Sequence, residues 1–452
     1  MNRRGIFADG QLERSSLKLA ELLGFRPRPS RSVPRGATRT SRKTVALCHS
    51  LLSERGEVSG SRLAAEALDA YQSLDDRARR AFFESLIREF SPDPEEVGQA
   101  GDAYRNTPSP ENLARLQKVV EAPRQELFRR LNLAPDGTRI LVAMRGQVLE
   151  EADRAPRLKP IATDLAHLFT SWFNRGFLVL RRIDWRTSAV ILEKLIQYEA
   201  VHQIQGWNDL RRRLEADRRC YAFFHPALPD EPIIFIEVAL TRALSDKVQA
   251  LLDLDSPVLD AESAEWAVFY SITNCQEGLR GVPFGSFLIK QVVEDVSKEF
   301  ARIKKFATLS PVPGFRKWLS EKTEALESNR KLAPFADAVE KLDNPQWMED
   351  AALQRQLLPL AAHYLLYAKQ NQEPLDPVAR FHLKNGARLE RINWLGDTSA
   401  SGLQRSAGLT ANYVYKLPDV ERNHELYVRE HKVRASREIE AQAKRFSPPA
   451  RF

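Results

Sequence analysis

The chain has 452 residues, a length that usually divides into two or more domains. Hydrophobic residues make up 43% of it, which is enough to build buried cores, and no apolar run approaches the roughly 20 residues needed to cross a bilayer. We therefore expect no membrane-spanning helix. The three cysteines, Cys48, Cys220 and Cys275, are too few and too widely spaced for a disulfide framework or a zinc site, so we expect a reducing compartment.

The formal charge of +8 and an isoelectric point near 9.3 make the protein basic. Such a balance is typical of many soluble proteins, but also of proteins that attract nucleotide phosphates or nucleic acid. Much of the excess lies in residues 26–43, which contain no acidic residue and suit either a flexible basic arm or a mitochondrial transit peptide. The Arg- and Ala-rich composition favours a bacterial, cytoplasmic protein, with the mitochondrial matrix as the alternative.

Residues 1–170 are predicted to form an all-helical domain, because their apolar residues recur at helical spacing and no strand pattern appears. Ser61 and Ser109 are expected N-caps, the latter followed by Pro110 at the first helical position. This domain carries few chemical groups, so we expect it to serve as a scaffold or in oligomerisation. The expected helices are Ser15–Leu23, Thr44–Leu52, Ser61–Leu74, Asp76–Phe90 and Glu111–Leu131.

Residues 171–452 alternate between strand and helix patterns, which predicts a mixed α/β domain and an α+β class for the whole chain. The run Pro232–Leu240 is almost continuously apolar, as in a strand of a sheet covered on both faces. Between Gly314 and Lys369 the chain is expected to be helical again, and a single charged helix is expected from Asp419 onward. The other expected strands are Phe177–Leu180, Cys220–Phe224, Trp266–Cys275, Phe306–Leu309, Leu389–Trp394 and Asn412–Lys416, and the expected helices between them are Ser188–Ala200 and Phe287–Ala301.

A glycine-rich turn connects the strand Trp266–Cys275 to the helix Phe287–Ala301. Its glycines let backbone N–H groups turn inward, and the following helix adds free N–H groups with a positive dipole end. This arrangement suits a pyrophosphate and is similar to the pyrophosphate loop of GNAT-type acetyltransferases, although a turn without a ligand is the alternative. The residues expected to bind coenzyme A are Arg280, Gly281, Val282, Pro283, Phe284, Gly285 and Ser286, with Arg280 adding a charge-assisted contact.

Three further polar residues are ambiguous when judged by themselves. Ser310 follows a strand and precedes two prolines, which suits a cleft but also an ordinary strand end. His382 titrates in the useful range, but so do His225 and His363. Tyr415 fits a half-buried position in a sheet.

Several long blocks of the chain closely resemble the malonyl-CoA decarboxylase family, in the family's order and approximate spacing. The resemblance covers about residues 170–416, with a weaker helical likeness before it. The blocks are Phe269-Tyr270-Ser271-Ile272, Gly278 to Lys290, Leu309 to Phe315, Phe381 to Trp394, and Gly408-Leu409 with Asn412-Tyr413.

The resemblance implies a helical domain used in oligomerisation, with a tetramer suggested, and a catalytic domain of acetyltransferase-like fold. It places the catalytic serine at Ser310, the catalytic histidine at His382, and supporting groups at Tyr415 and Ser271. Animal members carry an acidic side chain in the coenzyme A loop where this chain has Pro283, so a role of that acid does not transfer.

The reaction that this family catalyses is a carboxy-lyase reaction, in which malonyl-CoA gives acetyl-CoA and CO2. The electrons left at C2 delocalise onto the thioester oxygen as an enolate, so hydrogen-bond donors suffice and neither a metal nor an organic cofactor is expected. One well-placed donor contributes roughly 3–4 kcal/mol. We expect Ser310 and His382 to contact the malonyl group and relay the proton, in surroundings that are apolar near the departing carboxylate.

Two other functions remain open on the sequence. A coenzyme A-dependent acyltransferase of acetyltransferase-like fold would share the glycine turn but would need an acceptor groove. A non-catalytic nucleic-acid binder is suggested by the isoelectric point and the basic residues 26–43, and it would bind in a strongly salt-dependent way and tolerate the loss of Ser310 and His382. We expect malonyl-CoA and acetyl-CoA as the ligands, and neither nucleic acid nor a membrane as a partner.

Overall fold

The computed structural model describes residues 39–53, 57–282, 287–327, 333–342, 344 and 346–446. The expected helix Ser15–Leu23 and the loop residues Pro283 to Ser286 lie outside the described residues. The described residues form two compact units, which divide the chain into residues up to 137 with 155–161, and residues 138–154 with those from 162 onward. The expected domain boundary at residue 170 stays a prediction. The expected α+β class is confirmed, since helices come first and a mixed α/β region follows.

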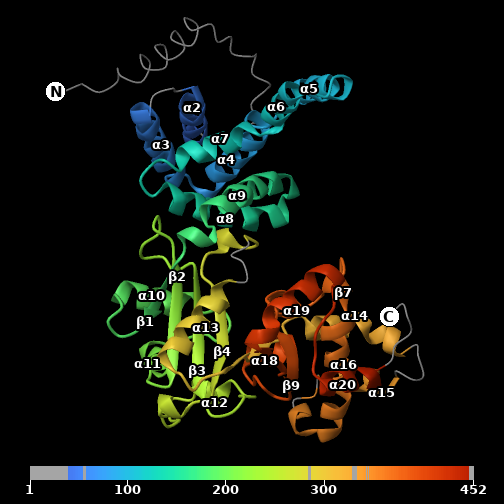
Figure 1. Cartoon of the computed structure of the whole chain (residues 1–452). Helices are drawn as coiled ribbons and strands as arrows, with labels where there is room; N and C mark the ends of the chain where they lie inside the picture. The colour runs from blue at the N-terminus through green and yellow to red at the C-terminus, as the bar shows by residue number, and fades with distance from the viewer. Residues whose placement is uncertain are drawn as a thin grey trace, which may run out of the picture. The chain divides into compact units, whose positions relative to one another are not determined.

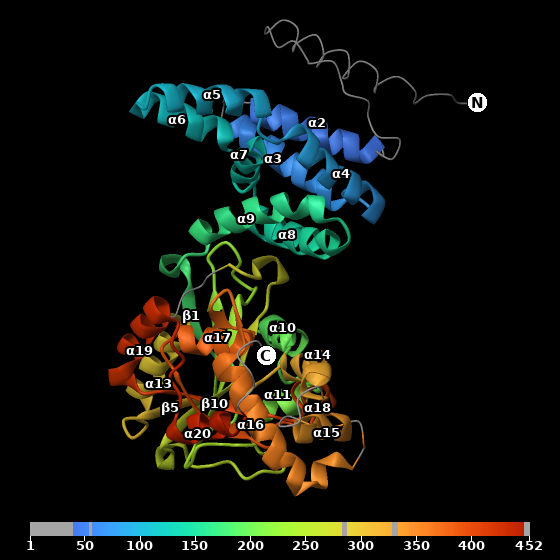
Figure 2. The same cartoon turned by 90° about the vertical axis from the view of Figure 1, so that its right-hand side faces the viewer.

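The first unit is built from helices around a buried aromatic core that includes Phe82, Phe83 and Phe128. Helices α2, α3, α4 and α7 contact one another, whereas α5 and α6 lie side by side as a pair (Figure 2). The bounds are α2 Arg39–Ser53, α3 Glu57–Gln72, α4 Asp76–Glu89, α5 Pro94–Asn106, α6 Pro110–Val120 and α7 Pro123–Leu131.

Most of these helices lie where they were expected, but two boundaries and one helix differ. Ser109 caps α6 as expected, with its hydroxyl accepting from the Asn112 N–H at 3.2 Å. Ser61 lies inside α3 and is not an N-cap. The single helix expected at residues 111–131 is wrong, because Pro123 lacks an N–H and holds Ala122 in an extended conformation. Helix α5 was not predicted.

The second unit is built on an eight-stranded sheet with the order β1-β2-β3-β4-β5-β10-β6, in which β9 pairs with the other edge of β10. Figure 1 labels β1 to β4 and β9 of this sheet. All neighbouring strands are antiparallel except β4 and β5, which are parallel. The bounds are β1 Val179–Ile183, β2 Arg218–Phe224, β3 Ile234–Thr241, β4 Trp266–Asn274, β5 Lys305–Thr308, β6 Ser310–Pro311, β9 Arg388–Asn393 and β10 Thr410–Tyr415.

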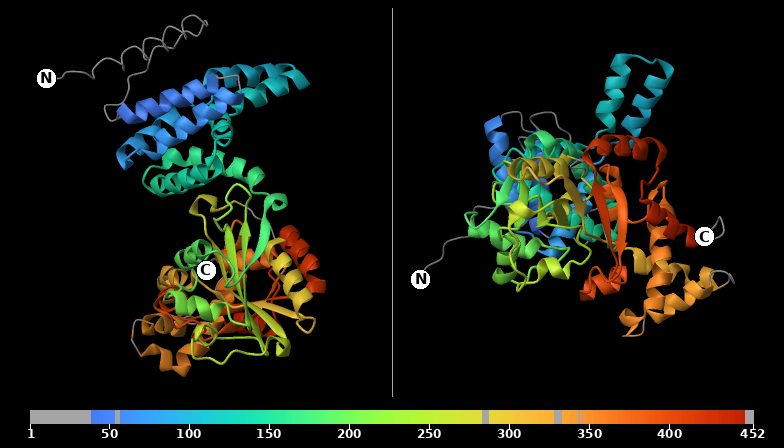
Figure 3. Two further views of the ribbon diagram at one scale, coloured as in Figure 1. Left: turned by 90° about the vertical axis from the view of Figure 1, so that its left-hand side faces the viewer. Right: turned by 60° about the horizontal axis from the view of Figure 1, so that its bottom comes forward.

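Helices cover both faces of this sheet, as the apolar pattern of β3 indicated. On β2, Cys220, Ala222 and Phe224 belong to the core shared with α10 (Ala189–Tyr198) and α11 (Trp207–Arg213). The alternate residue Tyr221 donates its hydroxyl to Asp295 of α13 (Phe287–Glu299) on the opposite face, at 2.8 Å. Figure 3 shows the strands between these two groups of helices. Every residue of β2 is therefore buried.

The parallel pairing of β4 with β5 stops halfway along β4. The pairs run from Trp266 with Lys305 to Phe269 with Thr308, and the last bond is donated by the Leu309 N–H to the Phe269 carbonyl at 2.9 Å. Beyond this point β4 pairs only with β3, while the chain after β5 pairs with β10 through β6. The two strands separate and leave a gap in the sheet.

The remaining helices lie mainly in the second unit, and none in the described part of the chain is long and apolar enough to cross a membrane. Helix α16 continues through the buried Pro359, and α20 packs along it (Figure 2). The single helix expected after Asp419 is wrong, because α19 ends at Glu430 and α20 begins at Arg437. The helices are α8 Gly137–Arg154, α9 Lys159–Trp172, α12 Gln249–Leu252, α14 Phe315–Glu327, α15 Ala333–Lys341, α16 Ala351–Tyr367, α17 Pro377–Lys384, α18 Ala400–Ser406, α19 Leu417–Glu430 and α20 Arg437–Arg445, and a short hairpin joins β7 Lys369–Gln370 to β8 Glu373–Pro374.

Replacing Gly278 by alanine should destabilise the second unit. A Cβ at this position would lie 1.8 Å from the Val142 carbonyl oxygen of α8, so the turn or the helix would have to move. We expect a loss of about 1–3 kcal/mol in the free energy of unfolding, measured by chemical denaturation. Gly146→Ala is the matched control, since its Cβ would meet Gly278 at an ordinary 3.5 Å. Equal stability of the two variants would contradict this account.

Candidate active site

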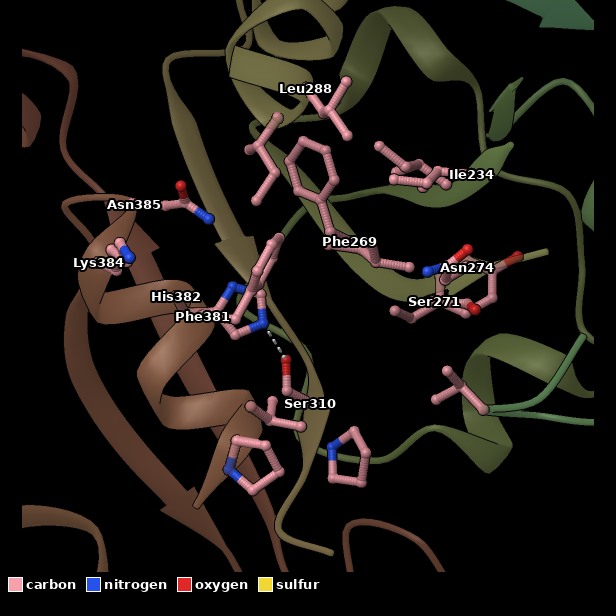
Figure 4. A pocket seen from close by; sticks show the side chains of 18 of the residues that line it. Ile234, Phe269, Ser271, Asn274, Leu288, Ser310, Phe381, His382, Lys384 and Asn385 are labelled. Atoms are coloured by element: carbon pink, nitrogen blue, oxygen red, sulfur yellow. Dashed lines mark hydrogen bonds between the residues drawn. The ribbon is translucent and has the colours of Figure 1, made fainter. Parts of the chain in front are cut away.

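A cavity of about 670 Å³ occupies the gap between the separated strands. One wall comes from β3 and β4, another from α13, and a third from β6 and α17, so the residues that line it are far apart in sequence. Figure 4 shows Ser310 and His382 on one side of this cavity and Ser271 with Asn274 on the other, with Phe269 between them. No aspartate or glutamate of the described residues lines the cavity.

Ser310, His382 and Tyr415 form a connected chain of polar groups at the cavity wall. Ser310 Oγ lies 3.0 Å from His382 Nε2, and His382 Nδ1 lies 2.9 Å from the Tyr415 hydroxyl. The Ser310 hydroxyl also donates to Thr308 Oγ1 at 2.9 Å. All four residues are buried. The structure thus brings together three of the predicted site residues, and Tyr415 is fully buried in the sheet where a half-buried position was one interpretation.

The position of His382 is fixed by the way its short helix begins and ends. Asp376 caps α17, with Oδ1 accepting from the N–H groups of Val378 and Ala379 at 3.0 and 2.8 Å. Gly386 follows the helix at a φ of +81°, a conformation that favours glycine. The imidazole also stacks on Tyr413, with ring centroids 4.8 Å apart. The ring therefore has little freedom to turn.

Burial lowers the pKa of His382 to about 3, so the imidazole stays neutral at physiological pH. A neutral imidazole has one N–H and one acceptor nitrogen. It can therefore donate on one side while accepting on the other, and can pass a proton between Ser310 and Tyr415. Burial likewise raises the pKa of Tyr415 well above its usual value, which keeps the phenol protonated as a donor.

Ser271 lines the same cavity from β4 but does not join this chain. Its hydroxyl donates instead to Glu199, at 2.8 and 3.0 Å from the two carboxylate oxygens. The other candidate histidines serve elsewhere, since His225 lies 3.0 Å from the Trp172 carbonyl and His363 stacks on Trp318. Neither lines the cavity.

The glycine turn lies at the end of β4 and is held against α8. Arg145, which is buried, donates to the carbonyls of Gly278 and Arg280 at 2.6 and 2.9 Å. Gly281 adopts a φ of +80°, and Val282 reaches the cavity. The Arg280 side chain is 62% exposed and forms an ion pair with the exposed Glu277 at 3.8 Å. Of the predicted loop residues, Arg280, Gly281 and Val282 are described.

Sequence reasoning missed four residues that shape this site. Asp376 carried a signal, because an aspartate before a proline at the start of an apolar-periodic segment is a recognised helix start. Thr308, Glu199 and Arg145 carried no local signal, since their roles arise from contacts 72 to 135 residues away or from a neighbouring position in the sheet. Within the described residues, no cluster of three or more metal-binding side chains occurs, and the three cysteines are free.

The chain matches two family models that together cover most of its length. Residues 90–173 match the malonyl-CoA decarboxylase N-terminal domain and residues 176–450 match the malonyl-CoA decarboxylase C-terminal domain. Among solved structures, malonyl-CoA decarboxylase from Rhodopseudomonas palustris is 49% identical, with a TM-score of 0.85 over 89% of this chain and 100% of that chain. The enzyme from Agrobacterium vitis is 48% identical, with a TM-score of 0.83 over 89% and 99% of the two chains.

Curated relatives give the same result. The mitochondrial malonyl-CoA decarboxylase of Anser anser anser is 36% identical over 85% of this chain and 84% of the relative. The mitochondrial malonyl-CoA decarboxylase of Rattus norvegicus is 32% identical over 94% and 96%. The chain belongs to the malonyl-CoA decarboxylase family.

Proposed function

We propose that this protein is a carboxy-lyase that converts malonyl-CoA to acetyl-CoA and CO2. The observation that carries the proposal is the Ser310–His382–Tyr415 chain, whose Ser310 and His382 line a cavity that begins beside the glycine turn. Coenzyme A would be anchored at the turn by backbone N–H groups and Arg280, and its thioester would reach Ser310. The loop residues Pro283, Phe284, Gly285 and Ser286 belong to the same proposed anchor.

The chemical step breaks the bond between C2 and the carboxylate. The electron pair moves to the thioester oxygen as an enolate, and CO2 leaves. The Ser310 hydroxyl can turn from Thr308 to donate to this oxygen, while the His382 ring supports Ser310 from behind. The enolate then takes a proton at C2 from the Ser310–His382 pair, and the pair recovers that proton from water. No acyl group leaves sulfur, so a covalent serine intermediate is not needed.

The leaving carboxylate is proposed to lie against the apolar part of the wall. The apolar side chains of Pro311, Val378 and Phe381 line the cavity close to Ser310 and His382. Among the described residues, Lys384 is the one lysine that lines the cavity. A tight ion pair with the carboxylate would stabilise the ground state more than the transition state and would slow the reaction. The thioester accepts the electrons, so we propose no metal and no organic cofactor, with coenzyme A acting as part of the substrate.

We also propose a homo-oligomer, with a tetramer as the expected state, assembled through the helical unit. Helix α6 contains no buried residue and exposes Leu113 and Val120 on its surface. The bacterial cytoplasm is the proposed location and the mitochondrial matrix the alternative, because the two bacterial structures are more similar in sequence than the mitochondrial relatives.

Light scattering on the purified full chain should give about four times its 51.5 kDa mass. Replacing both Leu113 and Val120 by glutamate should shift the mass downward without unfolding the chain, because both side chains are exposed within the monomer. A monomeric wild type would contradict the proposed assembly.

Ser310→Ala and His382→Ala should each lower kcat about 10²–10³-fold, because each removes a group that supports the charge on the enolate oxygen. The assay supplies malonyl-CoA alone and measures CO2 and acetyl-CoA. Release of CO2 without an acceptor would also separate this activity from an acyltransferase.

Ser320→Ala and His167→Ala are the matched controls, since both residues are exposed and lie outside the cavity. Their turnover should equal that of the wild type. Near-normal turnover in a correctly folded Ser310→Ala or His382→Ala variant would show that the assigned residues do not act in the reaction.

The pH dependence of kcat should show no inflection near 6.5 from His382. Burial depresses the pKa of this histidine to about 3, so its charge does not change in the working range. The pKa of His382 in the folded state lies below its unfolded value of about 6.5, so the unfolded state binds the proton first as the pH falls. The free energy of unfolding therefore decreases by up to about 1.4 kcal/mol for each pH unit below pH 6.5. His382→Gln should reduce this loss in unfolding experiments between pH 6.5 and 5. An acid limb near 6.5 that disappears in His382→Gln would overturn the neutral assignment.

A further inference from the structure

Glu199 is a buried carboxylate immediately behind the cavity wall, in the loop that follows α10. Its Oε1 accepts from the N–H groups of Val201 and His202, both at 2.7 Å. The Ser271 hydroxyl donates to the same carboxylate at 2.8 and 3.0 Å, and the Thr273 hydroxyl donates to Oε2 at 3.2 Å. Two backbone N–H groups and two hydroxyls thus converge on one side chain that is 5% exposed.

This arrangement determines whether the Ser271 hydroxyl can donate or accept a hydrogen bond in the cavity. A carboxylate only accepts hydrogen bonds, and a serine hydroxyl has a single proton to give. The Thr273 hydroxyl lies 3.2 Å from Ser271 Oγ and itself donates to Glu199. Because the Ser271 proton is committed to Glu199, the part of Ser271 Oγ that remains free for the cavity consists of lone pairs. Ser271 therefore presents an acceptor to a ligand, in contrast to Ser310, whose donor can turn toward the substrate.

A buried ionic network holds the Glu199 loop in place. Arg213 donates to the His202 carbonyl at 2.8 Å and to Asp209 at 2.8 Å, and it also pairs with Glu237 at 2.8 Å. Asp209 in turn accepts from the Gln205 N–H at 2.9 Å. These charges take no part in the proposed reaction, and their shared effect is to fix the loop that carries Glu199.

Ser271 lines the cavity between Ser310 and the glycine turn, the two points at which the proposed function anchors the ligand. It is two residues along β4 from Phe269, which is bonded to Leu309 next to Ser310, and it precedes the glycine turn that begins at Gln276. A coenzyme A thioester spanning these points passes Ser271 with its pantetheine arm. The thioester oxygen and the malonyl carboxylate are acceptors, so neither matches an acceptor at Ser271, whereas the amide N–H nearest the sulfur does.

We propose that Glu199 is a positioning residue that holds Ser271 as the acceptor for this amide N–H of the pantetheine arm. The inference deepens the proposed function and depends on it for the identity of the ligand. It assigns Ser271 to reading the arm of the substrate, and leaves stabilisation of the enolate to Ser310 and its partners. The hydrogen bond is made to substrate and transition state alike, so its loss appears in KM and not in kcat.

Glu199→Gln is the informative variant, because it reverses the hydrogen bond without changing the shape of the side chain. Its amide oxygen can keep the two backbone N–H bonds, and its amide nitrogen then donates to Ser271. The freed Ser271 proton turns toward the cavity, where it opposes the substrate N–H. We expect KM for malonyl-CoA to rise about tenfold and kcat to stay within about twofold.

Ser271→Ala only removes the acceptor and should raise KM by less, about threefold. The double variant Glu199→Gln, Ser271→Ala should return to the value of Ser271→Ala, because no hydroxyl remains to oppose the substrate. Glu193→Gln, an exposed position on the same helix, is the matched control and should behave as wild type.

Other orders of effect would overturn the proposal. If Ser271 donated to the substrate, Ser271→Ala would be the more damaging change, and Glu199→Gln would match or exceed the wild type. If Glu199 were only structural, the double variant would keep the full defect of Glu199→Gln and would melt at a lower temperature than Ser271→Ala.

A pair of truncated substrates tests the ligand group directly. The malonyl thioester of N-acetylcysteamine carries the amide N–H, and the corresponding thioester of O-acetyl-mercaptoethanol replaces it with an ester oxygen. Wild type should prefer the amide about tenfold in kcat/KM. Ser271→Ala should remove this preference, and Glu199→Gln should reverse it, because the freed Ser271 proton opposes the amide N–H but can donate to the ester oxygen. If the wild type used the amide and the ester equally well, the role proposed for Glu199 would be refuted but the proposed function would stand. If malonyl-CoA itself gave no CO2, the proposed function would be refuted.

Discussion

The separation of β4 from β5 after Phe269 is the constraint on which the site depends. A strand pair that stayed bonded would fill the space with backbone, whereas here the ladder ends with the Leu309 N–H bonded to the Phe269 carbonyl. Each strand keeps its other neighbour, since β4 stays paired with β3 and the chain after β5 pairs with β10. The polar side chains at the end of β4 and at the start of β6 therefore line one cavity.

On the side of the cavity that carries Ser310 and His382, burial sets the protonation state of the histidine. His382 arrives from a helix 72 residues beyond Ser310, and its imidazole is enclosed by Tyr413, Tyr415 and the sheet. Removal from water holds it neutral, which permits it to accept and donate at once. The carboxylate of Asp376 fixes the helix and not the His382 ring itself. It caps the N-terminus of α17, the helix that carries His382.

The opposite wall uses buried charge for orientation. Glu199 and the Arg213 network stand behind β4, and their effect reaches the cavity only through the direction of one hydroxyl proton on Ser271. At the glycine turn a buried charge fixes backbone groups, because Arg145 donates to the carbonyls of Gly278 and Arg280. In both places a charge that does not line the cavity orients the groups beside it.

The sequence by itself determined the class of fold, most of the elements and the position of the glycine turn. Amphipathic spacing gave the helices of the first unit, and the apolar run of β3 gave a sheet covered on both faces, because these patterns reflect local geometry that each segment carries alone. The family resemblance, and not the residue pattern, singled out Ser310, His382 and Tyr415 among equivalent candidates. Where a proline or a charged segment interrupted a long pattern, as at Pro123 and after Glu430, the expected single helix was wrong. Only the tertiary structure decided that β4 and β5 separate, that His382 is neutral, and that Ser271 turns its proton toward Glu199, because each of these depends on contacts between segments that are distant in the chain.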